Sequence, residues 1–467
     1  FQEDADHFLS LIYSTTVYSE RADNIISIPD QNINTNFDIP MLGPIPLNDS
    51  VSIPYSDNYT FVSPNNERFD SIFLKTCNIV FNINGDINHN AKIKISIPSA
   101  KKNGTSFQKT IDYNYSGSVP VIVNSAFSLD GYTIYLVTGN QLAINFVITF
   151  YGDGNTDNSP YSINMGESIQ SIKFRKIFGY LGQLPFSFKQ DSIDIGINSN
   201  NILGSITFTS PKLTIKANNG IGVPINITFD LLEAISSNNS VAINCTELNP
   251  FHIAAPTFAQ TVTSSFELNN TNIHPNIVDA LNMSPAPKYI NFHANALFNP
   301  IGDPAAKNFA IDSSKIALDM ELELPLEGKI PIFELQDTVD MDLGKELENL
   351  EWILFKISTT NGFPIDATVQ VYFADSLNVK LDSLIVPLEQ LISSGVVGAN
   401  GKVVTPTTKA TSVRIEKNRL DNLVTTKKLF IYAKLNSANN GATTIRIYSD
   451  YTIDVKIGVQ AQAKVNF

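Results

Sequence analysis

The 467-residue sequence is poor in cysteine and histidine. Its two cysteines, Cys77 and Cys245, exclude a small scaffold held by several disulfides, and a chain of this size does not need one. A single bridge between them remains open, beside the alternative of two small buried side chains in strands. None of the five histidines has a second histidine or a cysteine nearby in the chain, so no local zinc motif is present. We expect His89 to lie in a solvated turn.

Positive charge and long apolar runs are also scarce. The 32 lysines and arginines are outnumbered by 45 acidic residues, which gives a net charge of −13. Basic residues gather only in pairs such as Lys101-Lys102. Because nucleic-acid binding needs a basic face, nucleic acid is not expected as a partner. Apolar runs such as Leu142 to Phe150 are too short to span a bilayer as a helix.

Motifs of common enzymes are missing as well. The sequence contains no GxSxG, no HExxH, no P-loop and no GxGxxG that follows a strand. Asp319, Glu321 and Glu323 alternate along one predicted strand face, where solvated carboxylates have no reason to gain the raised pKa that glycoside hydrolysis requires. We therefore predict no catalytic residue, no cofactor and no enzymatic activity.

What the sequence does have is alternation. Leu213 to Phe229 holds two runs of alternating apolar residues around Asn218-Asn219-Gly220, which predicts a β-hairpin with one buried face. We expect Ile215, Ile227 and Phe229 to lie in a core. Similar stretches at Ile79 to Ile97 and Trp352 to Phe373 place the three turns about 140 residues apart, and such a fixed period marks repeated architecture.

These patterns predict a mainly β protein of about three tandem antiparallel β-sandwich-like units with a few short helices. The predicted domains are an N-terminal β domain at 1–180, a middle β-sandwich domain at 181–310 and a C-terminal β domain at 311–467. Short helices are predicted at Asn276 to Asn282, Pro387 to Ser394 and Thr338 to Leu350. Edge strands of such units must be covered or used, and we expect the stretch Pro40 to Pro54 to cover one edge and a partner to cover another.

One loop offers weak metal-ligand spacing. Asp153, Asn155 and Asp157 alternate as the first ligands of a calcium loop do. The sixth position is Asn158 and the twelfth is Asn164, where calcium loops have Gly and Glu. A polar hairpin turn explains the stretch equally well, so this is a weak calcium-loop candidate and no other metal site is predicted.

Tyrosines on the predicted strands suggest one further kind of ligand. Tyr113, Tyr115, Tyr132 and Tyr135 could stack on sugars if their rings are exposed. The competing interpretation is that they pair with side chains on neighbouring strands. Glycan binding therefore stays an alternative function.

The order of several short motifs resembles a known family. The motifs are Phe69 to Leu74, Ser210 to Leu213, Leu324 to Gly328, Gln336 to Thr338 and Asn361 to Pro364. Together they cover most of the chain and resemble the uncharacterised envelope lipoproteins of Bacteroidota, of the flavobacterial type. The strand–Asn–Gly–Pro–strand pattern is also similar to the small β-sandwich of late-embryogenesis-abundant type 2 proteins.

This resemblance implies an exported, mostly β protein of the Gram-negative envelope, in the periplasm or associated with the outer membrane. Members are often lipid-anchored through an upstream cysteine, and no cysteine lies near Phe1. The implied function is that of an accessory or structural subunit of a large complex, with an outer-membrane β-barrel protein or secretion complex as partner. One specific role that it suggests is the periplasmic plug of the type 9 secretion translocon. The alternative is a surface glycan- or ligand-binding lipoprotein.

Overall fold

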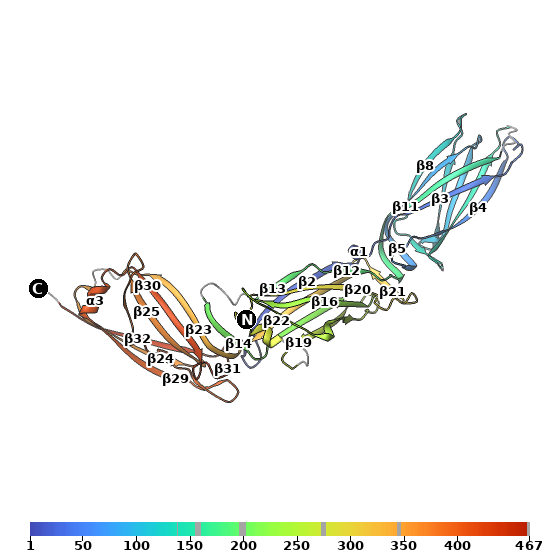
Figure 1. The fold of residues 1–467 in the computed structure, drawn as a ribbon. Helices are drawn as coiled ribbons and strands as arrows, with labels where there is room; N and C mark the ends of the chain where they lie inside the picture. Colours follow the sequence, from blue (N-terminus) through green and yellow to red (C-terminus); the bar gives the residue numbers. More distant parts are fainter. Residues whose placement is uncertain (138, 155–159, 196–201, 272–276, 343–346, 465–467) are drawn as a thin grey trace.

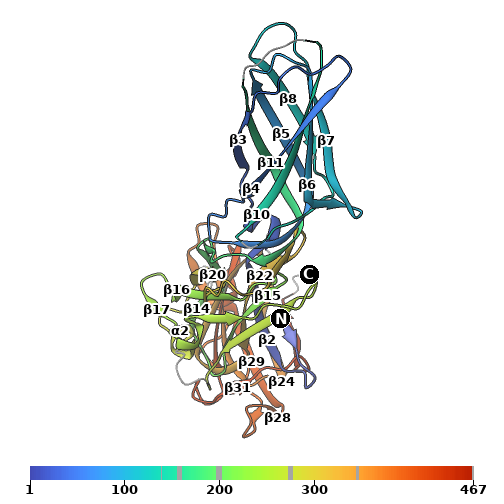
Figure 2. The same ribbon diagram turned by 90° about the vertical axis from the view of Figure 1, so that its right-hand side faces the viewer.

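The computed structural model describes residues 1–467 apart from 138, 155–159, 196–201, 272–276, 343–346 and 465–467. The protein is mainly β, with antiparallel sheets and three short α-helices in the described part of the chain. Three β units lie in an elongated row, as Figures 1 and 2 show. The predicted fold class of sandwich-like units with a few short helices is confirmed.

The N-terminal unit is a curled sheet in which β9 pairs with both β5 and β6 and so joins two layers. Its buried side chains alternate along each strand, because one face of every strand points inward. Its strands are β3 (Gln31–Ile39), β4 (Ser50–Thr60), β5 (Arg68–Gly85), β6 (Ala91–Lys102), β7 (Thr105–Tyr113), β8 (Val121–Ser128), β9 (Thr133–Tyr135), β10 (Gln141–Tyr151) and β11 (Tyr161–Tyr180).

The middle unit is a sandwich of two sheets, with strand order β1-β2-β22-β15-β19 in one and β12-β20-β16-β17 in the other. Its elements are β1 (Gln2–Glu3), β2 (Leu9–Arg21), α1 (Ala22–Ile25), β12 (Pro185–Ser187), β13 (Asp191–Asp194), β15 (Lys212–Asn219), β16 (Ile225–Ile235), β17 (Ser240–Ala242), η1 (Thr246–Leu248), β18 (Phe251–Ile253), β19 (Val262–Leu268), α2 (Ile277–Leu281), β20 (Tyr289–Phe298), β21 (Asn308–Ile311) and β22 (Lys315–Pro325). β21 pairs with β11 and so ties this unit to the N-terminal one.

The C-terminal unit has sheets of strand order β14-β23-β30-β25-β26 and β29-β24-β32. Its elements are β14 (Ile202–Phe208), β23 (Glu327–Asp340), β24 (Leu350–Asn361), β25 (Ile365–Ala374), β26 (Lys380–Ser383), β27 (Val396–Val397), β28 (Val403–Thr405), β29 (Thr407–Glu416), α3 (Lys417–Leu423), β30 (Lys428–Ser437), β31 (Ile445–Arg446) and β32 (Ile453–Ala463).

Strand pairing crosses the predicted domain boundaries at 180 and 310. β2 comes from the chain's N-terminal segment but pairs with β22 of the middle unit, so the N-terminus lies near the centre of the row (Figure 1). β14 lies near the middle of the sequence but pairs with β23 of the C-terminal unit. The N-terminal unit is therefore inserted in the chain between two parts of the middle unit.

The predicted hairpins are wrong, although their alternation is right. β15 pairs with β19 and β22, whereas β16 pairs with β17, β18 and β20 of the opposite sheet. The same holds for β24 and β25, and β5 and β6 likewise do not pair with each other but lie in the two layers of one curled sheet. Each turn is thus an arch that carries the chain from one layer to the other. Alternation shows only that each strand buries one face, and two strands that face each other across a core satisfy it as well as two paired strands do.

The arches of the middle and C-terminal units are built alike around a buried asparagine. The side-chain amide of Asn219 donates to the carbonyls of Val223 (2.9 Å) and Ala254 (3.1 Å). That of Asn361 donates to the carbonyls of Ile365 and Ser393, both at 2.9 Å. In each arch the side-chain oxygen accepts the amide N–H two residues on, also at 2.9 Å. The repeat expected from the sequence is therefore present in the structure.

A glycine follows each of these asparagines because the backbone of a neighbouring strand comes close. A Cβ at Gly220 would lie 3.0 Å from the Lys315 carbonyl oxygen, and one at Gly362 would lie 2.9 Å from that of Thr452. Gly220 does not have a positive φ, so close approach of the neighbouring backbone explains the residue. Gly220 and Gly362 donate to those two carbonyls at 2.8 Å, and in the N-terminal unit Asp86 donates likewise to Ser162.

These three contacts identify the equivalent strands β11, β22 and β32, which we call the closing strands. Ser162, Lys315 and Thr452 lie at or just before the start of these strands and accept the same backbone bond. Each closing strand pairs with the strand that enters its arch, which is β5, β15 or β24.

The helix predictions had mixed outcomes. α2 confirms the helix predicted at Asn276 to Asn282. Pro387 to Ser394 is not helical, since this segment lies beside β25, where Ile392 bridges to Ala367. Thr338 to Asp340 belong to β23, so the helix predicted from Thr338 is wrong at its start. α3, a short amphipathic helix whose Leu420 and Leu423 are buried, was not predicted.

A candidate interaction surface on the C-terminal unit

An additional strand covers the closing strand in two of the three units. The whole length of β3 pairs antiparallel with the first half of β11, from Gln31 opposite Ile169 to Ile39 opposite Tyr161. β2 pairs antiparallel with β22 in the same way, with one register shift between Thr16 and Tyr18. β3 precedes the other strands of its unit in the chain, and β2 precedes all those of its own unit except the two-residue β1.

These additional strands complete the core of their units. In β3, Phe37 is 3% exposed and its ring packs edge-on against Phe146 at 5.0 Å between ring centroids. In β2, Tyr18 packs edge-on against Phe188 at 4.8 Å. β3 also lies against β4, and β2 lies against β13, which are strands at the edges of the opposite layers. A single strand therefore closes each sandwich along one side.

β32 has no such cover in the described part of the chain. It is an edge strand and pairs with β24 alone. The Thr452 carbonyl accepts from Gly362, and the Lys464 N–H donates to Asn349, so backbone groups of even-numbered residues face β24. Because these groups alternate along a strand, those of the odd-numbered residues face outward. We call Ile453, Val455, Ile457, Val459 and Ala461 the open edge.

The side chains of the open edge are apolar and exposed. Ile457 is 63% exposed and Val459 is 62% exposed. The equivalent residues of β22, Met320 and Leu322, are both 0% exposed, and β22 is flanked by β2 in its sheet. The strand position and the alternation are the same in both units, so the missing additional strand accounts for the difference. An exposed, apolar strand edge is a template for pairing with another chain.

Burial falls steadily across this sheet toward the open edge. Val413 of β29 is 7% exposed, its neighbour Phe355 of β24 is half-buried, and Val459 is largely exposed. The opposite sheet shows exposed apolar side chains as well, at Leu335 and Val339 of β23. The C-terminal sandwich is therefore packed at the β29 side and open at the β32 side.

Charge distinguishes the polar face of β32 from that of β22. On β22 the polar residues are acidic, and Thr16 of β2 donates to Asp319 at 2.8 Å while Ser10 donates to Glu323 at 3.2 Å. In β32, Lys456 lies at the position equivalent to Asp319. A strand that covers β32 would therefore meet a cation where β2 meets a carboxylate.

The calcium-loop candidate is only partly visible. Asn155 and Asp157 lie outside the described residues, while Asp153 lies 3.3 Å from Nδ1 of His89. His89 is 4% exposed and packs edge-on against Tyr161 at 6.0 Å, so the expected solvated turn is wrong for this residue. Within the described ranges no three His, Cys, Asp or Glu side chains lie close enough together to hold a metal ion.

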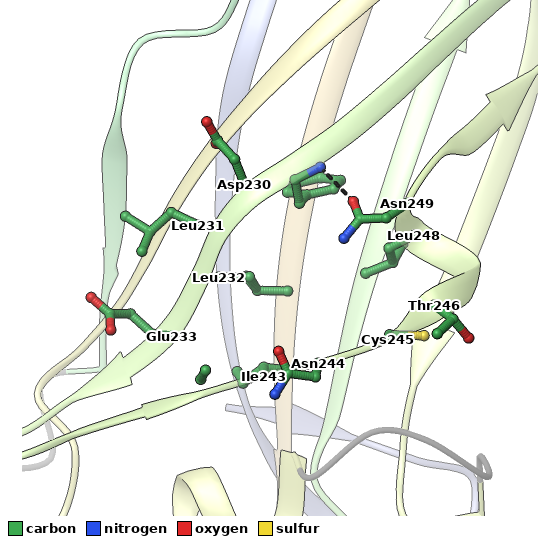
Figure 3. A pocket seen from close by; sticks show the side chains of 12 residues that line it. Asp230, Leu231, Leu232, Glu233, Ile243, Asn244, Cys245, Thr246, Leu248 and Asn249 are labelled. Atoms are coloured by element: carbon green, nitrogen blue, oxygen red, sulfur yellow. Dashed lines mark hydrogen bonds between the residues drawn. The ribbon is translucent and has the colours of Figure 1, made fainter.

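A polar pocket of about 490 Å³ lies on β16 between β17 and η1 (Figure 3). Asp230, Glu233 and Cys245 line it together with Asn249, whose Oδ1 accepts the Phe229 N–H at 2.8 Å. Burial and a 3.0 Å hydrogen bond to Glu247 raise the pKa of the Cys245 thiol to about 11. The thiol therefore stays protonated at neutral pH and is a poor nucleophile.

The two cysteines are not bridged. Both are free and buried, as small apolar side chains in the core would be. Burial also raises the pKa of Cys77, to about 12. Neither cysteine has the low pKa of a reactive thiol.

The tyrosines proposed for sugar stacking differ in exposure. Tyr113 is fully buried and its hydroxyl donates to the Ile87 carbonyl at 3.2 Å, so its ring cannot meet a glycan. Tyr132 packs edge-on against Phe107 at 5.8 Å, and Tyr115 is half-buried. Tyr135, 48% exposed, presents the largest free surface of the four.

No described protein family and no curated protein sequence matches the chain. A solved structure of a presumed secreted protein from Parabacteroides distasonis aligns at 12% identity and a TM-score of 0.30, over 59% of this chain and 83% of its own. The structure of Broad Bean Stain Virus aligns at 10% identity and a TM-score of 0.19, over 64% of this chain and 90% of its own. Similarity this weak supports no argument about function.

The open edge of β32 was not predicted from the sequence. The alternation of Ile453, Val455, Ile457 and Val459 is visible in the sequence and predicts a strand with one apolar face. Whether another strand covers that face depends on pairing between distant segments, as between β2 and β22.

Among the described helices none is long and apolar enough to cross a membrane.

Proposed function

We propose that this chain is a non-enzymatic, exported protein of the Gram-negative envelope that acts as an accessory or structural subunit of a large outer-membrane complex. The observation that carries the proposal is the open edge of β32, whose apolar side chains are exposed where those of β22 are buried. Contiguous exposed apolar surface on a folded protein marks an interaction site. The protein then works through a surface and not through a reaction.

The partner proposed is an outer-membrane β-barrel protein or secretion complex. An elongated row of sandwich units has a shape that suits filling or bracing the mouth of a pore (Figure 1). The resemblance to flavobacterial envelope lipoproteins favours the same partner and includes the role of a periplasmic plug of the type 9 translocon. A stable contact of this kind buries more than about 1,000 Å².

A glycan- or small-ligand-binding function is the second candidate, and the pocket on β16 favours it. The pocket has a volume of about 490 Å³, and its lining includes carboxylate and amide groups of Asp230, Glu233, Asn244 and Asn249 (Figure 3). Such groups can hydrogen-bond sugar hydroxyls. No exposed aromatic ring lines this pocket, so stacking does not contribute there.

Affinity purification of the tagged chain from its native envelope tests the first proposal. We expect a large β-barrel protein to co-purify with it after extraction in mild detergent. The double variant Val455→Lys/Val459→Lys should lose this partner, whereas Gln460→Lys on the opposite face of β32 should retain it. Recovery of the chain alone, as a monomer that binds a defined glycan, would favour the second candidate.

A further inference from the structure

We propose that β32 accepts a single extended strand from a partner protein, which pairs antiparallel with the open edge and inserts alternate apolar side chains into the C-terminal sandwich. This inference rests on the proposed function and specifies how the partner binds. Strand addition to an exposed edge is a general mode of peptide recognition in which main-chain hydrogen bonds give affinity and alternate side chains give specificity.

The same chain shows twice what belongs at this position. β3 pairs with the edge of β11, and β2 pairs with the edge of β22. Each of them comes from a part of the chain that lies before the closing strand with which it pairs. Because the arches place β11, β22 and β32 equivalently, the edge of β32 is the third copy of one site. In the described chain this third copy alone has no strand beside it.

Direction and length follow from the two occupied copies. Both occupants run antiparallel to their closing strand, and the shorter one, β3, has nine residues. The open edge presents outward-facing backbone groups at every second residue from Ile453 to Ala461. A partner strand of about nine to eleven residues would satisfy these groups and cover the apolar side chains between them.

A lone strand fits this position better than the sheet edge of a second copy. In the complete units the occupant lies between the closing strand and a strand at the edge of the opposite layer, β4 or β13. β23 is the corresponding strand of the C-terminal unit, because it pairs with β30 as β4 pairs with β10, and β14 pairs with its other side from Gly328 to Leu335. A lone strand would extend the sheet of β32 as β3 and β2 extend theirs, whereas a second copy would bring its own β24 along with its β32.

The side chains of the partner strand follow from those of β32. Its inward positions should hold apolar residues, since they meet Val455, Ile457 and Val459. Its outward residue opposite Lys456 should be acidic, because β2 places Thr16 as a donor opposite the acidic Asp319 at the equivalent position. The partner segment therefore alternates apolar and polar residues and carries an acid near its middle.

Phage display of eleven-residue peptides on the full chain tests this. One library places apolar residues at alternate positions, and a matched library places the same residues with helical spacing. We expect only the alternating library to give binders, and a synthetic copy of a selected peptide to bind saturably. A fluorophore on the peptide's N-terminus should transfer energy more efficiently to an acceptor at Ala463 than to one at Ile453, since the pairing is antiparallel.

Three variants locate the binding. Val459→Lys removes apolar contact, and Ile457→Pro removes an N–H that faces outward and leaves the ladder to β24 intact. Both should weaken peptide binding about tenfold or more. The matched variant Gln460→Lys, on the polar face, should bind as the parent does. Because these residues are exposed in the free chain, the variants should fold, which circular dichroism checks.

Other outcomes overturn the inference. Peptides that bind equally well to Val459→Lys and Ile457→Pro would place the site elsewhere. Failure of the alternating library, with the chain monomeric or dimeric by light scattering, would reject a partner strand, and a dimer abolished by Val459→Lys would assign the edge to a second copy. If the envelope partner still co-purifies with Val455→Lys/Val459→Lys, the proposed function stands and this site does not.

Discussion

The middle and C-terminal units share one architecture, yet their closing strands lie in opposite environments. Met320 of β22 is fully buried, and the equivalent Ile457 of β32 is 63% exposed. Both strands alternate apolar and polar residues, and a carbonyl at or just before the start of each accepts a backbone bond from a buried-asparagine arch. Alternation therefore gives a strand one apolar face, but whether that face is buried depends on whether another strand pairs with its free edge.

The largest expected effect comes from truncating the equivalent side chains. Met320→Ala should lower the free energy of unfolding by about 2–5 kcal/mol, because it leaves a cavity in a closed core. Ile457→Ala should change it by less than about 0.5 kcal/mol, since its side chain already meets water. Chemical denaturation of the two variants measures both values, and equal losses would show that the open edge is covered in solution.

Variants at the arch asparagines test a feature that the middle and C-terminal units share. Asn219→Ala and Asn361→Ala each remove a buried amide that donates to two carbonyls and accepts one N–H. Leaving these groups unsatisfied should cost about 1–3 kcal/mol in each unit. We expect the two losses to be similar, because the arches are complete in both units. A negligible loss at Asn361 would mean that the C-terminal arch contributes little to stability.

Glu167 occupies the position of Met320 and Ile457 in the closing strand β11. Burial raises its pKa to about 7, although Thr35 donates to one carboxylate oxygen at 3.3 Å. A raised pKa means that the folded state binds the proton more tightly than the unfolded state, so stability falls as pH rises from about 4.5 to about 7.

Glu167→Gln should remove this pH dependence. At pH 8 the variant should be more stable than the parent by about 1–2 kcal/mol, and near pH 4 the two should be similar. Urea melts across this pH range measure the difference. A parent chain whose stability rises between pH 5 and 7 by way of this residue would contradict the assigned burial of its carboxylate.

The smallest effect concerns the charge on the polar face. Lys456→Glu should leave stability within about 0.5 kcal/mol of the parent, because exposed charges contribute little. It should weaken the binding of a strand with an acidic residue opposite by about two- to fivefold. Calorimetric titration with a selected peptide at low salt measures this change, and an unchanged affinity would argue against the proposed register.

The fold was predictable where neighbouring residues determine it. Leu213, Ile215 and Ala217 alternate as a strand and are fully buried in the structure, and Phe229 is 6% exposed as expected. The hairpins were not predictable, since Asn-Gly turns occur in arches as well as in hairpins and alternation is the same in both. The pairing of β2 with β22 joins segments on either side of the whole N-terminal unit, and no local pattern indicates it.

The candidate surface was predictable in part. An edge strand in need of a partner follows from sandwich architecture, but its location in β32 depends on which closing strand lacks a cover. The weak calcium loop at Asp153 could not be decided from spacing, and its other two residues lie outside the described ranges. The burial of His89 was missed because its neighbours in the sequence, Asn88 and Asn90, are polar, whereas the burial of Tyr113 agrees with one of the two interpretations that the sequence left open.

Residue-resolved amide hydrogen exchange on the free chain tests the open edge of β32 most directly. The N–H groups of Val455, Ile457, Val459 and Ala461 should exchange fast, and those of the intervening residues should be protected by β24. In β22, which has a strand on both sides, successive N–H groups should all be protected. Uniform protection along β32 would contradict the account, because it would mean that this edge is already occupied.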